Sequence, residues 1–209
     1  MNTTLKNFAT MGLGLVIFAV GPVAAKLTHD ARRLHRLAMT DDLTGLHNLR
    51  SFERRLVMLI GETRGTGYEI VLLVLDLDRL KSLNDVHGHL AGAEAVRTVG
   101  QLIAAGVPGE AVACRYGGDE FVVALPRTTR GRARETAEGL RHAVQATAPM
   151  LAGIPFPAGT LSISIGIAGR KFEANATERD DQAGEALFRQ ADQALYIAKA
   201  RGRNHIHMA

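Results

Sequence analysis

Disulfides and long basic runs are absent from this chain and aromatic residues are few, and these features argue against two classes of protein. The 209 residues include one cysteine, Cys114, so no intramolecular disulfide forms and nothing indicates an oxidising compartment. The net charge is +4, but no run of lysine and arginine exceeds two residues, and only 5% of residues are aromatic. A nucleic-acid-binding protein usually combines basic patches with stacking aromatics, so no nucleic-acid partner is expected.

The remaining composition is that of a globular protein. Apolar residues make up 46% of the chain and charged residues 22%, which is enough apolar material for a hydrophobic core. The length allows one ordinary domain with a short appendage.

A charge-free stretch near the N-terminus, residues 8–25, predicts a transmembrane helix. It has eighteen residues, and about 17–25 apolar residues cross a bilayer as a helix. Basic residues follow it, which predicts that its C-terminal side faces the cytoplasm; they are Lys26, Arg32, Arg33 and Arg36. We therefore expect a membrane anchor over residues 1–26.

Two other interpretations of this stretch compete with the anchor. Val23-Ala24-Ala25 resembles the small-residue cleavage site of a signal peptide. A buried core helix is the third interpretation, and the flanking charges argue against it.

The next segment, residues 27–40, carries a short helical stripe. Its apolar residues are spaced four, three and four apart, at Leu27, Ala31, Leu34 and Ala38. This stripe either forms a stalk that pairs two subunits or packs on its own domain, and the sequence leaves both open.

From about residue 40 onward, helix and strand patterns alternate without a repeat. Amphipathic spacing predicts helices around 52–60, 96–106, 130–144 and 184–201, and apolar or alternating runs predict strands at 70–75, 111–116, 119–125, 161–167 and 205–207. Gly117-Gly118 joins two of these strands and predicts a tight hairpin with a primed turn. The predicted fold class is α/β, an α+β sandwich whose central, mostly antiparallel sheet is surrounded by helices and preceded by the transmembrane helix.

Two aspartates occupy positions suited to metal chemistry. Asp76 ends a buried strand, and Asp119 directly follows Gly117-Gly118. If the two strands are neighbours, both carboxylates face one cleft, where they and substrate phosphates can hold Mg²⁺ for an in-line phosphoryl transfer. The structural alternative is that Asp76 caps the following turn.

Two cations lie close together near the C-terminus. Lys199 and Arg203 are four residues apart, so they are expected to project in a similar direction near one helix end, where cations can clamp phosphate oxygens. The residues alone favour the other interpretation, in which basic residues at a helix C-terminus interact favourably with its dipole.

Several motifs in order resemble the GGDEF domain family of diguanylate cyclases. Residues 115–121 read RYGGDEF, which contains the signature Gly117, Gly118, Asp119, Glu120 and Phe121. The other motifs are DDLTGLHN at 41–48, DLDRLK at 76–81 with Asn84-Asp85 and Gly88-His89, SISIG at 162–166, and the final block at 191–204. They span about 170 residues, essentially the whole chain after the predicted stalk.

The resemblance implies a fold similar to the palm of polymerases and to class III nucleotidyl cyclases, with a specific site. Asp76, Asp119 and the Leu77 carbonyl would bind Mg²⁺ or Mn²⁺, with Glu120 close by. Further substrate contacts would come from the backbone N–H groups of Arg79 and Leu80 to phosphates, from Lys199 and Arg203 to the terminal phosphates, from Lys81 to the triphosphate, and from Asn84 to the base.

The same resemblance implies the reaction. Two GTP molecules, one on each subunit of a homodimer, would condense to cyclic di-GMP with release of pyrophosphate. The catalytic domain would be residues 41–209, in the cytoplasm at the bacterial inner membrane. The alternative is a catalytically weak or inactive module that binds GTP or a partner signalling protein.

Four departures from the family pattern qualify these implications. Ala93 replaces the aspartate that accepts hydrogen bonds from guanine, and losing a bond to a charged acceptor costs about 1.5–3 kcal/mol. A relaxed preference for GTP over ATP is therefore expected. Leu80 and Leu49 replace a phenylalanine and an arginine. Residues 108–111 lack the R-x-x-D motif of product inhibition, so no such site is expected.

Overall fold

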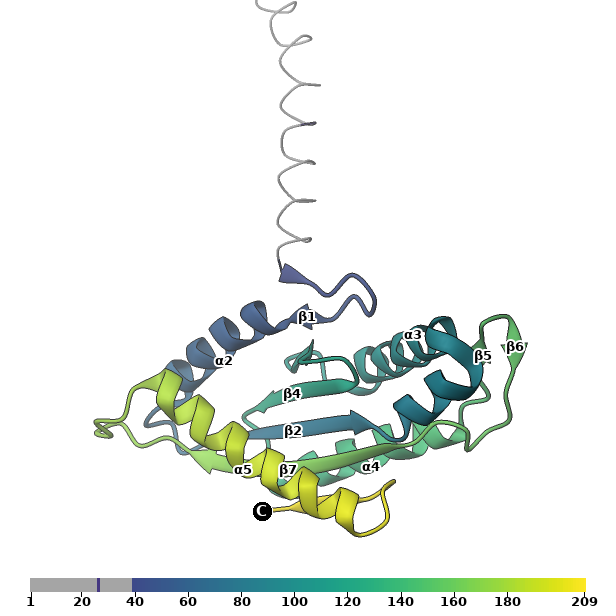
Figure 1. Ribbon diagram of the computed structural model, residues 1–209. Helices are drawn as coiled ribbons and strands as arrows, with labels where there is room; N and C mark the ends of the chain where they lie inside the picture. The colour runs from purple at the N-terminus through teal and green to yellow at the C-terminus, as the bar shows by residue number, and fades with distance from the viewer. Residues whose placement is uncertain (1–25, 27–38) are drawn as a thin grey trace, which may run out of the picture. The chain divides into compact units, whose positions relative to one another are not determined.

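A six-stranded sheet forms the centre of this computed structural model, which describes Lys26 and residues 39–209 (Figure 1). Its strands, in spatial order, are β1 (His47–Asn48), β3 (Val112–Arg115), β4 (Glu120–Pro126), β2 (Glu69–Leu77), β7 (Ile163–Lys171) and β8 (Ile206–Met208). The β3–β4, β4–β2 and β2–β7 pairs are antiparallel, whereas β1 and β8 pair in parallel at the two edges. A small hairpin, β5 (Met150–Leu151) and β6 (Ile154–Pro155), lies outside this sheet. The predicted mostly antiparallel sheet is confirmed.

Four helices of the described chain cover the two faces of the sheet (Figure 1). They are α2 (Leu49–Thr63), α3 (Leu80–Gly106), α4 (Arg130–Ala146) and α5 (Asp180–Ala200). Buried residues of α3 and α4 share one hydrophobic cluster with the sheet, and those of α2 and α5 share another. Residues 40–209 form one compact unit.

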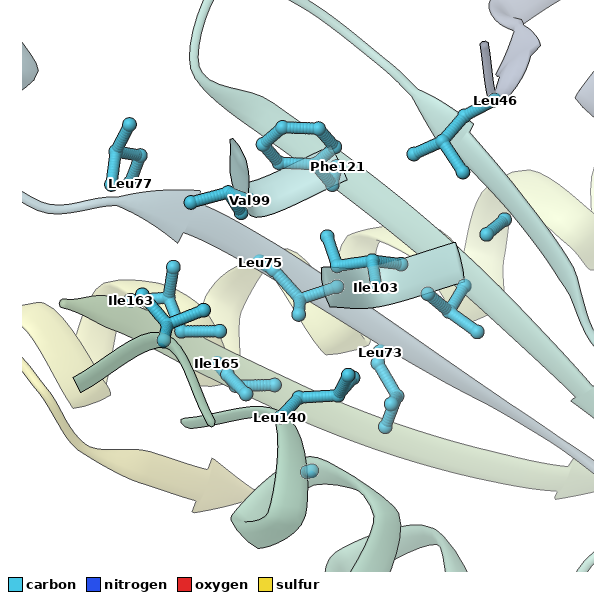
Figure 2. Packing of buried hydrophobic residues seen from close by; sticks show 14 of the residues in the cluster. Leu46, Leu73, Leu75, Leu77, Val99, Ile103, Phe121, Leu140, Ile163 and Ile165 are labelled. Carbon is cyan, nitrogen blue, oxygen red and sulfur yellow. The ribbon is translucent and has the colours of Figure 1, made fainter. Parts of the chain in front are cut away.

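The central strand β2 explains why both faces are buried. Its residues alternate between the two clusters: Leu73 and Leu75 face α3 and α4, whereas Leu72 and Val74 face α2 and α5. Figure 2 shows Leu73 and Leu75 beside Phe121 and Ile103 in the first of these clusters. An apolar run with no polar interruption is what a strand buried on both faces requires.

Helix α5 lies unusually close to strand β7. A Cβ atom added at Gly166 would lie 2.1 Å from the Ala191 carbonyl oxygen and 2.2 Å from the Leu195 nitrogen. Only glycine therefore fits beneath this helix, and the close approach fixes the height of α5 above the sheet.

Helix α3 begins earlier than the helix predicted from the sequence around residues 96–106. It starts at Leu80, directly after the left-handed Arg79 (φ 59°), and is interrupted at Gly88, whose φ of 82° and ψ of 163° are not helical. Its first segment carries Lys81 and Asn84, and its second carries Ala93. The break lets the two segments present these residues to one cavity.

Two expectations from the sequence are wrong. The transmembrane helix of the predicted fold class is not supported, because none of the helices in Lys26 and residues 39–209 is long and apolar enough to cross a bilayer. The predicted span, residues 8–25, and most of the predicted stalk lie outside the described residues. The Gly117-Gly118 hairpin has no primed turn either, because neither glycine has a positive φ; a four-residue connection, 116–119, joins β3 to β4.

Candidate active site

The two predicted metal carboxylates meet at one end of the sheet. In the β2–β4 pairing Asp76 lies opposite Glu120, and the Leu77 N–H donates to the Asp119 carbonyl oxygen at 3.0 Å. Asp76 is buried, with 7% of its surface exposed, and Asp119 is half-buried. Strands β2 and β4 are therefore neighbours, as the sequence prediction required, and they bring these acidic residues together.

Burial dominates the electrostatics of Asp76. It raises the pKa of this carboxyl to about 6, and the negative charges of Asp119 and Glu120 add to the rise. Lys199 opposes both effects, because its Nζ lies 2.8 Å from Asp76 Oδ2. A buried carboxyl among other carboxylates is disfavoured as an anion, so this site gains from a bound cation.

The donor set fits a hard divalent cation that is shared with a substrate. In the part of the chain that the structure describes, no three side chains of histidine, cysteine, aspartate or glutamate form a metal-binding group. Mg²⁺ usually takes one or two carboxylates and completes its shell with water and substrate phosphates rather than with an all-protein cage. Asp76, Asp119 and the Leu77 carbonyl match that pattern.

A cavity of about 480 Å³ lies beside the hairpin and contains the residues predicted to read the base. Asn84, Ala93 and Lys81 line it together with Asp119. Among the described side chains, Asn84 Oδ1 is the one buried polar atom with no hydrogen-bond partner. Asn84 and Ala93 therefore line one cavity, and their contacts with a base stay a prediction.

Gly92 makes room for the Asn84 side chain. A Cβ atom at position 92 would lie 1.8 Å from Asn84 Oδ1, so any other residue would displace the amide. Sequence reasoning missed this role, because the two residues are adjacent only through the break in α3 at Gly88.

A second cavity, of about 250 Å³, adjoins the start of α3. Arg79 and Leu80 line it, and Leu80 borders both cavities. Arg79 is left-handed directly before the helix start, a conformation in which backbone N–H groups can form an anion-binding nest. The phosphate contacts of Arg79 and Leu80 stay a prediction.

The two C-terminal cations do not share one helix face. Helix α5 ends at Ala200, so Lys199 is helical, whereas Arg203 lies in a turn with a φ of 65°. Lys199 reaches Asp76, and the Arg203 side chain is exposed. Arg203 is therefore not part of α5, and the helical spacing assumed between it and Lys199 does not hold.

Sequence reasoning also missed how the hairpin is held. Arg115 donates from Nη2 and Nε to the Gly118 carbonyl oxygen, at 2.8 and 3.2 Å, and from Nη1 to Asp41 Oδ2 at 3.2 Å. Burial raises the pKa of Asp41, but hydrogen bonds from Thr44 and the charge of Arg115 outweigh burial and lower it. Arg115 therefore ties the loop that precedes Asp119 to the start of the domain.

Comparison with known proteins identifies the family of this arrangement. The family model described as "Diguanylate cyclase, GGDEF domain" matches residues 38–205. The chain belongs to the GGDEF family. Diguanylate cyclase DgcP of Pseudomonas aeruginosa is 35% identical over 190 residues, which cover 88% of this chain and 27% of DgcP. Response regulator PleD of Caulobacter vibrioides is 36% identical over 176 residues, which cover 81% of this chain and 36% of PleD.

The same fold occurs in solved GGDEF structures. The coiled coil and GGDEF domain of DgcB from Caulobacter crescentus, solved in complex with c-di-GMP, superposes with a TM-score of 0.81 at 29% identity. That match covers 94% of this chain and 99% of the DgcB chain. This chain spans well under half the length of DgcP and PleD, so what it shares with them is the GGDEF domain.

Proposed function

We propose that this GGDEF protein is a diguanylate cyclase that condenses two GTP molecules into cyclic di-GMP and releases pyrophosphate. One observation carries the proposal: Asp76 and Asp119 meet at the end of β2, with Lys199 in contact with Asp76 and a base-sized cavity beside them. Each step of the reaction joins a 3′-oxygen to an α-phosphorus and breaks the bond from that phosphorus to the pyrophosphate leaving group.

Charge neutralisation is the main task of such a site, because a triphosphate carries several negative charges. Asp76, the Leu77 carbonyl and Asp119 would hold Mg²⁺ or Mn²⁺, which lowers the cost of negative charge on the attacking and leaving oxygens. Lys81 is exposed at the cavity rim beside Asp119 and would steady the triphosphate. Glu120, adjacent to Asp119 and opposite Asp76, adds negative charge that favours cation binding.

The other phosphate contacts come from two directions. The N–H groups at Arg79 and Leu80 would bind phosphate oxygens at the start of α3, and Arg203 would bind the terminal phosphates. Lys199 is paired with Asp76 at 2.8 Å, and a triphosphate offers it a competing and more highly charged partner.

A homodimer would complete the reaction, because one chain offers one such site and the product joins two nucleotides. The two sites would face each other so that each 3′-oxygen reaches the other nucleotide. Turnover per subunit would then rise with protein concentration until the dimer is saturated.

Relaxed base specificity is the finer part of this proposal. Ala93 lines the base cavity without an acceptor, and Asn84 supplies an amide that can both donate and accept. Guanine and adenine differ in the pattern of donors and acceptors on their edges, so a site without the aspartate distinguishes them less. We expect comparable turnover of ATP and GTP, with mixed products. Strict use of GTP would contradict this part alone.

The test is product formation by the full chain with Mg²⁺, with GTP and ATP supplied separately and together and products identified by mass. Asp119→Ala should remove all product, whereas Glu135→Ala, which deletes an exposed carboxylate on α4, should leave the rate unchanged. GTP binding without product, by a chain shown to be dimeric, would favour the inactive binding module instead.

Inhibition by the product, cyclic di-GMP, is a separate property of the proposed enzyme. Residues 108–111 in the α3–β3 connection contain neither residue of the R-x-x-D motif. We propose that the enzyme has no high-affinity feedback site of that type. Tight noncompetitive inhibition by added cyclic di-GMP would refute this.

A further inference from the structure

Asp78 is a buried carboxylate that the proposed mechanism does not use. It lies two residues beyond Asp76, and 8% of its surface is exposed. We propose that Asp78 is a positioning residue that holds the turn 202–204, and with it Arg203, at the phosphate end of the active site. The functional part of this inference rests on the proposed role of Arg203 as a phosphate ligand.

Both oxygens of Asp78 are occupied by donors of this chain. Oδ1 accepts from Ser164 Oγ at 2.7 Å, and Oδ2 accepts from Ser162 Oγ at 2.8 Å and from the Asn204 N–H at 2.9 Å. The Asp78 N–H in turn donates to the Ser162 carbonyl oxygen at 2.9 Å. Asp78 therefore joins the end of β2 to the start of β7 and to the C-terminal turn. It differs in this from Asp76, whose carboxylate pairs with the Lys199 cation.

The turn that Asp78 holds is conformationally costly. Arg203 and Asn204 have φ values of 65° and 47°. A left-handed conformation costs a residue such as arginine about 1–2 kcal/mol, and asparagine tolerates it better. Two consecutive residues of this kind persist only where their surroundings hold them. The Asn204 N–H bond to Asp78 supplies one restraint.

A second restraint comes from the opposite side. Arg141 of α4 donates from Nη1 to Asn204 Oδ1 at 3.1 Å. Asn204 is thus held through its backbone by the sheet and through its side chain by a helix. The neighbouring Arg203 is exposed. Because the restraints act on the backbone of the turn and on Asn204, they fix the position of the Arg203 backbone without engaging its side chain.

Losing the acceptor at position 78 would release the turn. In Asp78→Ala the Asn204 N–H loses its partner, and the two left-handed residues lose the restraint that offsets their cost. Lys199 precedes this turn on α5, so it would stay in place. Ser162 Oγ and Ser164 Oγ lose their acceptor as well, but Asp76 stays paired in the sheet and with Lys199. The largest expected damage is therefore to what Arg203 does, whereas the loss of a metal ligand would remove turnover altogether.

An isosteric variant separates positioning from chemistry. In Asp78→Asn the amide oxygen can still accept from Asn204 and Ser162, while the amide nitrogen donates to Ser164 Oγ, because a hydroxyl both donates and accepts. A positioning residue should therefore tolerate asparagine. A metal ligand or proton-transfer group should not, because a carboxamide does neither task well.

The first measurement is amide hydrogen exchange of Asn204 in the full chain without nucleotide. We expect slow exchange in the parent protein and in Asp78→Asn, and exchange at least about tenfold faster in Asp78→Ala. Protection of the β7 amides should stay unchanged, which shows that Asp78→Ala is folded. Equal exchange of Asn204 in all three proteins would overturn the inference, whether or not the protein is a cyclase.

The second measurement is the affinity for an α,β-methylene analogue of GTP, compared with that for GMP, in the presence of Mg²⁺. Asp78→Ala should weaken binding of the triphosphate by roughly tenfold to a hundredfold and leave GMP binding nearly unchanged. Asp78→Asn should stay within about threefold of the parent. Adding Arg203→Ala to Asp78→Ala should cause little further loss, because both changes remove the same contact.

The remaining outcomes separate the positioning role of Asp78 from the proposed cyclase activity. Additive losses in the double variant, or an Asp78→Asn variant as weak as Asp78→Ala, would overturn the positioning role while leaving the cyclase assignment intact. A parent protein that binds no triphosphate would instead refute the proposed function, and the exchange measurement would still decide whether Asp78 holds the turn.

Discussion

The proposed phosphate half of the active site (Asp76, Asp119 and Lys199) and the proposed base half (Asn84, Gly92 and Ala93) are built on different principles. In the phosphate half, two carboxylates at the ends of β2 and β4 meet a lysine of α5, and Lys199 and Asp76 are paired at 2.8 Å. The base half sits on α3 and depends on shape and neutral polar groups, with Asn84 Oδ1 unpartnered. Because different elements carry the two halves, the residues of one half can differ from the family pattern while those of the other half are kept. Ala93, which stands where the family pattern has an aspartate, is such a difference in the base half.

The largest expected effect is in the phosphate half. Asp76→Asn should reduce product formation at least about a thousandfold, because the metal site loses a charged ligand. The same variant should be more stable in metal-free buffer. Burial raises the pKa of Asp76 from its ordinary value to about 6, so folding favours the protonated form, and the stability this provides is lost as pH rises through about 6.

The stability part is measured by urea unfolding of both proteins at pH 5 and pH 8 with a chelator present. Asp76→Asn should gain of the order of 1–3 kcal/mol over the parent at pH 8 and less at pH 5. An equal difference at both pH values would show that the Asp76 charge is not disfavoured by the fold.

The next effect restores the base half. Ala93→Asp should raise the preference for GTP over ATP by about tenfold to a hundredfold, because a carboxylate accepts from guanine and not from adenine at that edge. Ala93→Asn, which has the same shape without the charge, should give a smaller gain. The readout is the ratio of kcat/KM for the two nucleotides, and an unchanged ratio would place the specificity elsewhere.

A smaller effect tests how Asn84 is positioned. Gly92→Ala should raise KM about tenfold with little change in kcat, because its Cβ would displace the Asn84 amide. Gly139→Ala on α4 is the matched control, since a Cβ there meets nothing within 4 Å. The control should keep full activity, and helix propensity should make it more stable by up to about 1 kcal/mol. A normal KM in Gly92→Ala would show that Asn84 does not contact the substrate.

The smallest effect concerns the residue between the two halves. Arg115 lines the base cavity and also donates to the Gly118 carbonyl beside Asp119. Arg115→Lys loses the paired donors of the guanidinium, so kcat/KM should fall by about threefold to tenfold and equally for GTP and ATP. Arg97→Lys on the exposed side of α3 should change neither value. A loss restricted to one nucleotide would assign Arg115 to base recognition.

The strands of the sheet could be predicted from the sequence because each is marked by a short, continuous pattern of apolar residues. The run 70–75 and the alternating run 161–167 need only burial on both faces to become β2 and β7. The sequence prediction placed this helix only around 96–106, although Leu80, Leu83 and Val86 recur at helical spacing in its first segment. The break at Gly88 could not be foreseen, because a single glycine within a helical pattern is often tolerated without a break.

The site residues were predicted through the family resemblance, whereas the contacts that hold them were not. Asp78 and Asn204 are separated by 126 positions, and Asp41 and Arg115 by 74. No local pattern connects such residues. The turn at Arg203 also depends on these contacts, because a left-handed backbone is uncommon at arginine, although asparagine adopts it more readily.

Gly166 shows that the demands of the active site extend beyond the residues that touch a substrate. Its missing side chain sets the distance between β7 and α5 at Leu195, and Lys199 follows one helical turn later. A larger residue at 166 would lift the helix, and the lysine with it, away from Asp76. Position 166 should therefore be under selection as strict as that on a catalytic residue, and an enzyme engineer should treat it as part of the active site.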